Sequence, residues 1–439
     1  MGNKNYILLS LLTAMVLTNN PANATEDINT TKNKEWIILP YAFSSDATGL
    51  SGGISAIKEG LFQPRTKLIA TVFTGLSEDV VINEQKDKAT FSGGFISFSD
   101  FKLPYTDRFF FSFMGLKSYF PKNRYYIDGS NTSDKSDVYI SSGDSDFLAT
   151  TFRYTLPIGE GLDNPEGLYS LQEGFSVGRD NYGNGVPFIT GRTSIGLKTF
   201  FQTENTDNTE MWQDPIWWEN GTSVPTWNTN GLRLFLTHDN TDFEINPSTG
   251  YQFKLQYSKD FGRGDSLQSW DFLEFKYNQY FNLDTFYFTK QNVLALSIWT
   301  GYSFSWDNDS EIFPGFDAHR PPMWEGARLG GFNRMRGYDQ DRFSDKAAFY
   351  AAAEYRAIID YNPLKNNAWI PAKVDWFQVV LFAEAGRVHD QYNYNLISDM
   401  QYDVGVSLRA MVSELPIRLD VAYGEDAYLW LMVQHPFDF

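Results

Sequence analysis

Residue types that commonly carry out chemistry are present in this 439-residue chain, but their spacing assembles no catalytic or metal site. The four histidines lack the spacing of metal ligands; they are His238, His319, His389 and His435. A short acidic run could meet a divalent cation but is typical of a solvated loop; it comprises Asp307, Asp309 and Glu311. The chain has no cysteine, nucleophile elbow, phosphate loop or dinucleotide fingerprint, and no spacing singles out the triad of an outer-membrane lipase. We therefore expect no catalytic residues, no metal, no cofactor and no enzyme activity.

The densest group of arginines, glycines and aromatic residues lies between positions 326 and 343. A planar guanidinium is well suited to bidentate pairing with a carboxylate. Arg336 on such a loop could fold back against a wall of strands and meet inward carboxylates. The alternative is that the charges of this region and of the strands are independent and solvated by water.

The elements that would position these side chains are β-strands, because apolar and polar residues alternate almost everywhere after Trp36. Successive side chains of a strand point to opposite faces, so one face is apolar and the other polar. Charges such as Arg409, Arg418 and Asp420 at this spacing favour a wet lumen with lipid outside. A soluble barrel or sandwich would instead pack its apolar faces together.

About sixteen strands are expected, an even number as in bacterial single-chain barrels. They are predicted to begin near Trp36, Gly49, Thr66, Thr90, Arg108, Ser145, Pro187, Gly231, Gly250, Trp270, Lys290, Ala347, Trp376, Gln401, Leu415 and Ala427. Most long polar connections then face outward and short turns face the periplasm. The segment 158–186 conflicts with this rule, since it is long yet falls on the periplasmic side; it contains either misread strand or an inward-facing excursion.

Composition agrees with an all-β membrane protein. Aromatic residues make up 17% of the chain, yet its mean hydropathy is −0.37 and the mature part lacks an apolar run long enough for a helical span. Aromatic girdles and alternating faces are features of transmembrane barrels, with a large soluble all-β protein as the alternative. The net charge of −18 disfavours nucleic acid as a partner.

The N-terminus indicates export. An apolar stretch from Tyr6 to Leu17 precedes Pro21 and an Ala-Asn-Ala cleavage site ending at Ala24. We expect residues 1–24 to be a signal peptide, 25–35 a short periplasmic segment and 36–439 a transmembrane antiparallel β-barrel in a bacterial outer membrane. An uncleaved N-terminal anchor is the alternative. Lipid and lipopolysaccharide would then surround the protein.

The motifs around the arginine-rich segment resemble the BamA/TamA superfamily of outer-membrane insertases, also called bacterial surface antigens. Met335-Arg336-Gly337-Tyr338 is similar to the hydrophobic-Arg-Gly-aromatic motif of the family's sixth extracellular loop. The order of the following segments is also similar: they are 350–356, 382–388, 405–409 and 416–422, with Glu384 where the family usually has Asp. The similarity covers about 231–439 and, more faintly, 39–56.

The resemblance implies that this extracellular loop folds into the lumen and that its arginine meets acidic residues of the wall. We therefore predict an Arg336–Glu384 pair. The predicted structural site comprises Arg336, Gly337, Tyr338, Glu384, Glu354, Arg409, Arg418 and Asp420. Its role would be to brace the barrel and hold its gate.

The resemblance also implies a lateral seam between the first and last strands, at about 36–44 against 427–435. Pro436 cannot donate to a strand ladder, so the last strand is expected to stop near Gln434. The alternative is that Pro436 merely ends the strand outside the membrane.

The function implied by the resemblance is assistance in inserting membrane proteins, with client barrels as partners, or handling of lipids through the seam. Family insertases recruit clients through periplasmic POTRA domains, for which this sequence leaves no room between Ala24 and the first strand, so it resembles a barrel-only branch. The alternatives are a passive or gated pore for small solutes, and a structural or lipid-homeostasis barrel. The sequence gives no client, substrate or oligomeric state.

Overall fold

The computed structural model describes residues 36–45, 47–82, 85–178, 186–211, 218–219, 222–223, 226–307, 318–365, 373–412 and 415–432. Sixteen strands form one sheet. They are β1 (Ile37–Ser45), β2 (Gly49–Glu59), β3 (Lys67–Ile82), β4 (Gln85–Lys102), β5 (Phe109–Tyr125), β6 (Tyr139–Thr155), β9 (Arg192–Asn205), β12 (Thr226–Thr241), β13 (Gly250–Asp260), β14 (Trp270–Leu283), β15 (Thr289–Tyr302), β18 (Ala347–Ile359), β19 (Val374–His389), β20 (Gln401–Val412), β21 (Leu415–Tyr423) and β22 (Ala427–Met432).

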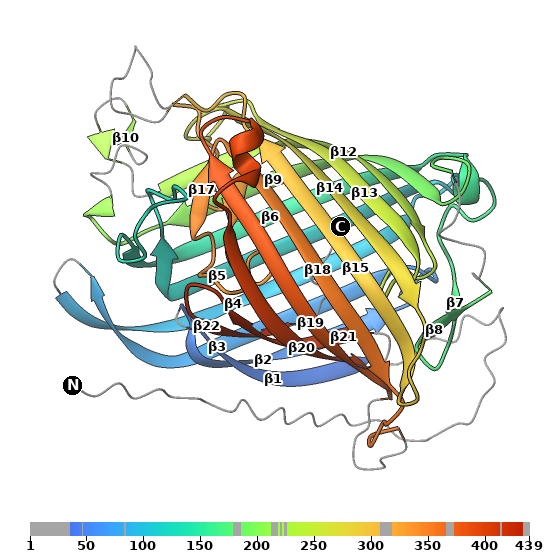
Figure 1. Ribbon diagram of the computed structural model, residues 1–439. Coiled ribbons are helices and arrows are strands. Elements are labelled where there is room, and N and C mark those ends of the chain that lie inside the picture. The colour runs from blue at the N-terminus through green and yellow to red at the C-terminus, as the bar shows by residue number, and fades with distance from the viewer. Residues whose placement is uncertain are drawn as a thin grey trace.

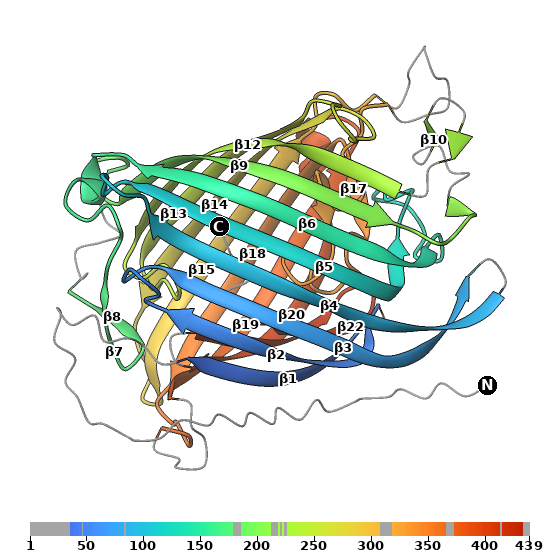
Figure 2. The ribbon, with the colours of Figure 1, turned by 180° about the vertical axis from the view of Figure 1, so that it is seen from behind.

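Each strand of this sheet pairs antiparallel with the strands before and after it, from β1 at one end to β22 at the other. The predicted sixteen antiparallel strands are therefore confirmed. Figures 1 and 2 show the sheet curling round, so that β14–β20 and β2–β6 lie on opposite sides of the molecule. Within the described residues, no ladder joins β1 to β22.

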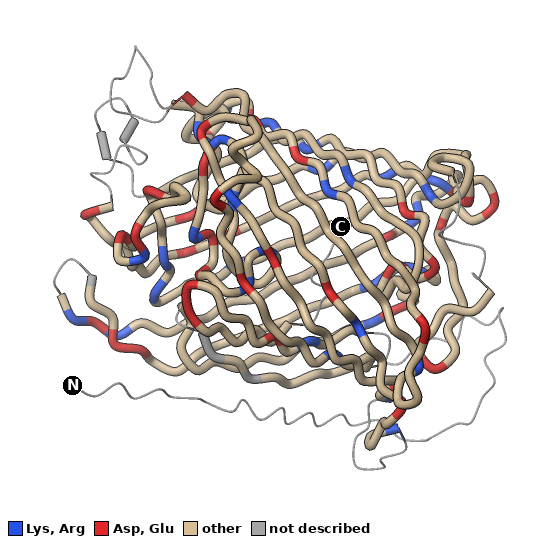
Figure 3. Tube along the Cα trace, in the orientation of Figure 1, with Lys and Arg blue, Asp and Glu red and all other residues tan. Residues whose placement is uncertain are grey.

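The two faces of the sheet differ as the alternation predicts. On β19 the side chains of Phe382 and Glu384 are buried, whereas the side chain of Leu381, which directly precedes Phe382, is 54% exposed. On β20 the side chains of Asp403 and Arg409 are buried, and the apolar residues that alternate with them are exposed. The buried, polar side is called the inner face below. Charged positions therefore occur along the strands as well as in the connections (Figure 3).

The segment 158–178 is an excursion and adds no strand to the main sheet. It contains the 3-10 helix η1 (Gly159–Leu162) and a small hairpin of β7 (Ser170–Gln172) and β8 (Phe175–Val177). The hairpin lies at the opposite end of the sheet from β17 (Figure 1). Trp376 on β19 donates from Nε1 to the Gly174 carbonyl oxygen at 3.1 Å. The described part of this segment thus contains two short strands, and neither of them joins the main sheet.

Other short pairs join β16 (Ala327–Leu329) to β17 (Phe343–Asp345) and β10 (Trp218–Glu219) to β11 (Thr222–Ser223). The predicted signal peptide, the segment 25–35, Pro436 and the positions Asp309 and Glu311 lie outside the described residues. In the part of the chain that is described, no helix has the length and apolar character needed to cross a membrane.

Candidate functional site

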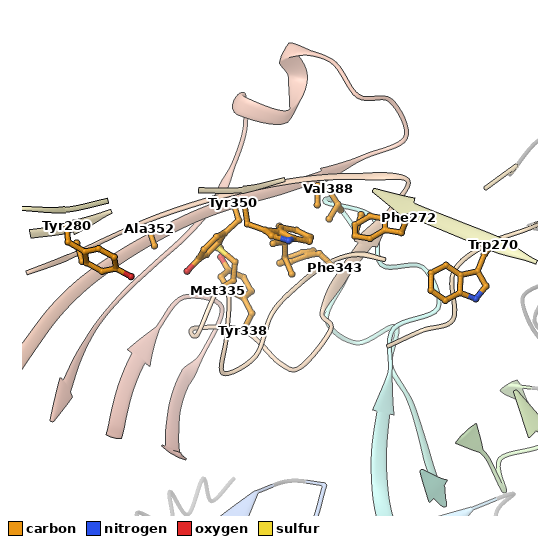
Figure 4. Packing of buried hydrophobic residues seen from close by; sticks show 14 of the residues in the cluster. Trp270, Phe272, Tyr280, Met335, Tyr338, Phe343, Tyr350, Ala352 and Val388 are labelled. Carbon is orange, nitrogen blue, oxygen red and sulfur yellow. The ribbon is translucent and has the colours of Figure 1, made fainter. Parts of the chain in front are cut away.

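The long connection between β15 and β18 carries the arginine-rich segment and lies against the inner face. Its β16–β17 pair forms a short stem, and the tight loop between the two strands places several apolar side chains on the wall. Met335, Tyr338 and Phe343 pack with Tyr350 of β18 and Val388 of β19 (Figure 4). This apolar packing holds the loop against the wall independently of its ionic contacts.

Glycines let the loop turn tightly and approach the wall. Gly330 has φ +114°, and a Cβ there would lie 2.2 Å from the Asp339 carbonyl oxygen. At Gly337 a Cβ would lie 2.5 Å from the Gly424 nitrogen and 2.6 Å from the Asp403 Cβ. A side chain at either position would therefore displace the loop.

Arg336 is fully buried and contacts three carboxylates of the wall. Its Nε donates to Glu384 Oε1 at 3.2 Å. Its Nη1 donates to Asp420 Oδ2 at 3.2 Å, and its Nη2 donates to Glu354 Oε1 at 3.0 Å. The Arg336 backbone N–H also donates to Glu384 Oε2 at 2.6 Å. The guanidinium carbon lies 3.4 Å from the centre of the Phe382 ring, in cation–π geometry.

The carboxylates that receive Arg336 are themselves held by the arginines of neighbouring strands. Glu354 accepts from Arg409 at 2.8 Å and from Arg356 Nε at 2.8 Å. Asp420 accepts from Arg418 at 2.6 Å. With Asp403, the group holds four arginines and four carboxylates, so its charges can balance inside a buried space.

All eight residues predicted for this site come together. Arg336, Gly337 and Tyr338 come from the loop, and the wall positions come from β18, β19, β20 and β21, which are consecutive in the sheet. The Gly337 N–H donates to Asp403 at 3.0 Å, and the Tyr338 hydroxyl donates to the Tyr402 carbonyl oxygen at 3.1 Å. The predicted Arg336–Glu384 pair is present.

Three contributors were missed from the sequence. Asp403 shares the inner face of β20 with Arg409, so the period of two could have found it. The Tyr350 hydroxyl donates to Glu384 Oε1 at 2.5 Å. Trp430 of β22 donates from Nε1 to the Arg336 carbonyl oxygen at 2.8 Å, a contact that no periodicity predicts.

The same connection reaches other parts of the sheet. Arg342 donates to Glu425, in the β21–β22 turn, at 3.0 to 3.1 Å. Arg124 at the end of β5 donates to both oxygens of Asp339 at 3.0 and 3.1 Å. Because β5 and β21 lie on different sides of the curled sheet, the connection ties them together.

A second charged group lies in the turns at the other end of the strands. Glu244, between β12 and β13, accepts from Arg192 at 2.9 Å and from Arg65 at 3.2 Å. Burial alone would raise the pKa of Glu244, but the two guanidiniums outweigh it and lower the pKa to about 2. This group joins the β2–β3 turn, the start of β9 and the β12–β13 turn, which are distant in sequence.

A sheet of sixteen antiparallel strands with an apolar outer face and a charged inner face defines the class of outer-membrane β-barrels. The chain belongs to the Omp85 superfamily, whose domain model matches residues 101–428. The resemblance to the BamA/TamA proteins is thereby confirmed. Comparison with curated proteins found no match.

A solved structure with a TM-score above 0.5 agrees in fold. CdiB from Escherichia coli is 10% identical, with a TM-score of 0.51; 91% of this chain and 60% of that chain are covered. BamA from Haemophilus ducreyi lacking POTRA domains 1–3 is 12% identical, with a TM-score of 0.46 and coverage of 91% and 68%. CdiB from Acinetobacter baumannii is 12% identical, with a TM-score of 0.46 and coverage of 91% and 57%. The chain thus spans well under two thirds of the length of either CdiB structure.

Proposed function

We propose that this outer-membrane barrel assists the insertion of membrane proteins, or handles lipids, through a lateral opening between β1 and β22. The observation that supports the proposal is that these strands are the two ends of the sheet, with no ladder between their described residues. Strand edges with unmade hydrogen bonds can accept an incoming strand. Client barrel proteins, outer-membrane lipid and lipopolysaccharide are the proposed partners.

Pro40 supports the assignment of β1 as a free edge. It lies in the middle of β1, opposite Ile54 of β2. Proline has no N–H to donate, and in sheets it is confined to edge strands, strand starts and bulges. A partner strand on the other side of β1 would meet a gap in the ladder at this residue.

The proposed role of the β15–β18 connection is to lie in the lumen and brace this seam from inside. Arg336 is fixed to β18, β19 and β21 by its three carboxylates. Its carbonyl oxygen receives the Trp430 indole of β22, and Phe332 packs edge-on against the same indole. The last strand is therefore held to the wall through the loop as well as through β21.

A cysteine pair tests the seam, and the absence of native cysteine leaves any introduced pair unique. Leu39 of β1 and Leu431 of β22 line the same cavity from the two end strands, so Leu39→Cys with Leu431→Cys is the pair to test, with disulfide formation verified by gel migration before and after reduction. We expect oxidation to stop acceleration of barrel assembly and phospholipid transfer in liposomes, and reduction to restore them. The single-cysteine variants are the controls. Equal activity in the oxidised and reduced states would refute a working seam.

A gated pore for small solutes is the second candidate, favoured by a cavity of about 1350 Å³ on the inner side of the sheet. A pore would conduct steadily in planar bilayers, and deletion of residues 326–343 would enlarge the conductance. Conductance that is absent both with and without the segment would exclude this candidate.

A further inference from the structure

The inner cavity is cationic although the protein is strongly acidic. Eight basic and four acidic side chains line it, so positive charges exceed negative ones by four. The whole chain carries a net charge of −18. Basic side chains thus outnumber acidic ones where an enclosed ligand would meet them, opposite to the balance of the whole chain.

Four of the eight lining cations gather at one place in the cavity. Lys198 on β9 lies directly opposite Arg233 on β12, and Lys254 is on the adjoining strand β13. Arg334 reaches the same space from the β15–β18 connection. Like charges directly opposite each other destabilise a sheet, so this arrangement works against folding unless something compensates for it.

Carboxylates of the protein compensate for only part of this charge. Glu325 forms an ion pair with Arg233. Glu274 is a second carboxylate near the cluster, and its oxygens accept from Gln256 at 2.5 Å and from the Trp299 indole at 2.8 Å. Asp341 is a third, which interacts with Arg334 and with Arg328.

The remaining cations contact rings in place of carboxylates. Lys198 lies 5.4 Å from the Phe147 ring centre, Lys254 lies 6.0 Å from that of Phe235, and Arg334 lies 3.8 Å from that of Trp299. Among the described residues, these three cations form no ion pair. The four cations therefore outnumber the nearby carboxylates Glu274, Glu325 and Asp341, so positive charge stays in excess.

We propose that this cluster is a binding site for a phosphate monoester or related phosphate anion. Such a group carries a charge of about −1.5 to −2 near neutral pH, opposite in sign to the excess. A guanidinium and ammonium groups converging from several elements are suited to phosphate oxygens. The site would lie on the inner face whether or not the seam opens, so the proposal does not depend on the insertase role.

Isothermal titration of the purified full-length protein, in an uncharged detergent at low ionic strength, tests the site. Glycerol 3-phosphate is the soluble probe, and dihexanoyl phosphatidic acid presents the same group as a lipid headgroup. We expect saturable binding that weakens as salt is added. The Lys198→Gln/Lys254→Gln double variant should weaken binding at least about tenfold, the equivalent of losing one good ionic contact. Binding of the lipid probe alone would assign the site to headgroups.

The matched control is the Lys117→Gln/Lys365→Gln double variant, which removes two lysines that are 81% and 45% exposed and paired outside the cavity. It should bind like the wild type, and a Lys198→Arg/Lys254→Arg variant should retain binding. If the glutamine variant fails to fold, Arg334→Gln gives the same comparison. No saturable binding of either probe to the wild type, or equal binding to the cavity variants, would overturn the proposal.

Discussion

Replacing Arg336 by alanine should destabilise the barrel more than any exposed charge substitution. Glu354 would keep Arg356 and Arg409, and Asp420 would keep Arg418. Glu384 would lose its ion-pair partner and keep the Tyr350 hydroxyl. Breaking a buried pair by removing one partner costs about 3–5 kcal/mol. Since two of the three carboxylates stay paired, we expect the lower part of this range.

The assay is urea unfolding of the protein in lipid, followed by tryptophan fluorescence and by heat-modifiable migration on gels. Arg263→Gln is the charge-matched control, because Arg263 is exposed in the β13–β14 turn. Its effect should stay within about 0.5 kcal/mol. Arg336→Lys keeps the charge but loses the planar guanidinium. Its loss of stability should therefore lie between those of Arg336→Ala and Arg263→Gln. Equal unfolding midpoints for Arg336→Ala and Arg263→Gln would refute the reasoning that the pairing braces the wall.

Three further substitutions probe other contacts with the same unfolding assay. Gly337→Ala should displace the loop, because its Cβ would meet the Gly424 nitrogen at 2.5 Å; a wild-type midpoint would contradict this. Trp430→Phe should cost about 1 kcal/mol, the typical contribution of one hydrogen bond, and no change would show that the indole does not hold β22. The lowered pKa of Glu244 stabilises the fold above the ordinary glutamate pKa, and this stability is lost as the pH falls toward about 2. Glu244→Gln should therefore flatten the dependence of stability on pH below about pH 5. Parallel profiles for the wild type and the variant would exclude this contribution of Glu244.

Strand existence was predictable from the sequence because one face of each strand meets lipid and the other water. Several strand starts were less predictable: β6 begins at Tyr139 and not near Ser145, and β9 at Arg192 and not near Pro187. At β6, backbone pairing extends beyond the stretch in which apolar and polar side chains alternate, so the sequence pattern does not reveal where the strand begins. The strands β7 and β8 have three residues each, too few for any periodicity to be recognised.

The site was predictable where it depends on alternation and on motif order. Glu354, Glu384 and Asp420 each lie on the polar face of a strand, and the resemblance supplied the arginine that they receive. The contribution of Trp430 was not predictable, because it depends on how far the loop reaches across β21 toward β22. Spatial reach of a long connection is set by tertiary packing and leaves no local pattern.

The way the loop is attached determines which side of the proposed seam can move. Strands β18 to β21 share one buried ionic group, and β22 is joined to that group through Trp430 and Phe332. Among the described residues, no comparable contact ties β1, which pairs there with β2 alone and carries Pro40. Lateral opening on this arrangement moves β1 away from a fixed β22. Spin labels on β1 and β20 should therefore broaden their distance distribution when clients or lipid are added, whereas labels on β22 and β20 should not; the reverse result would place the moving edge at β22.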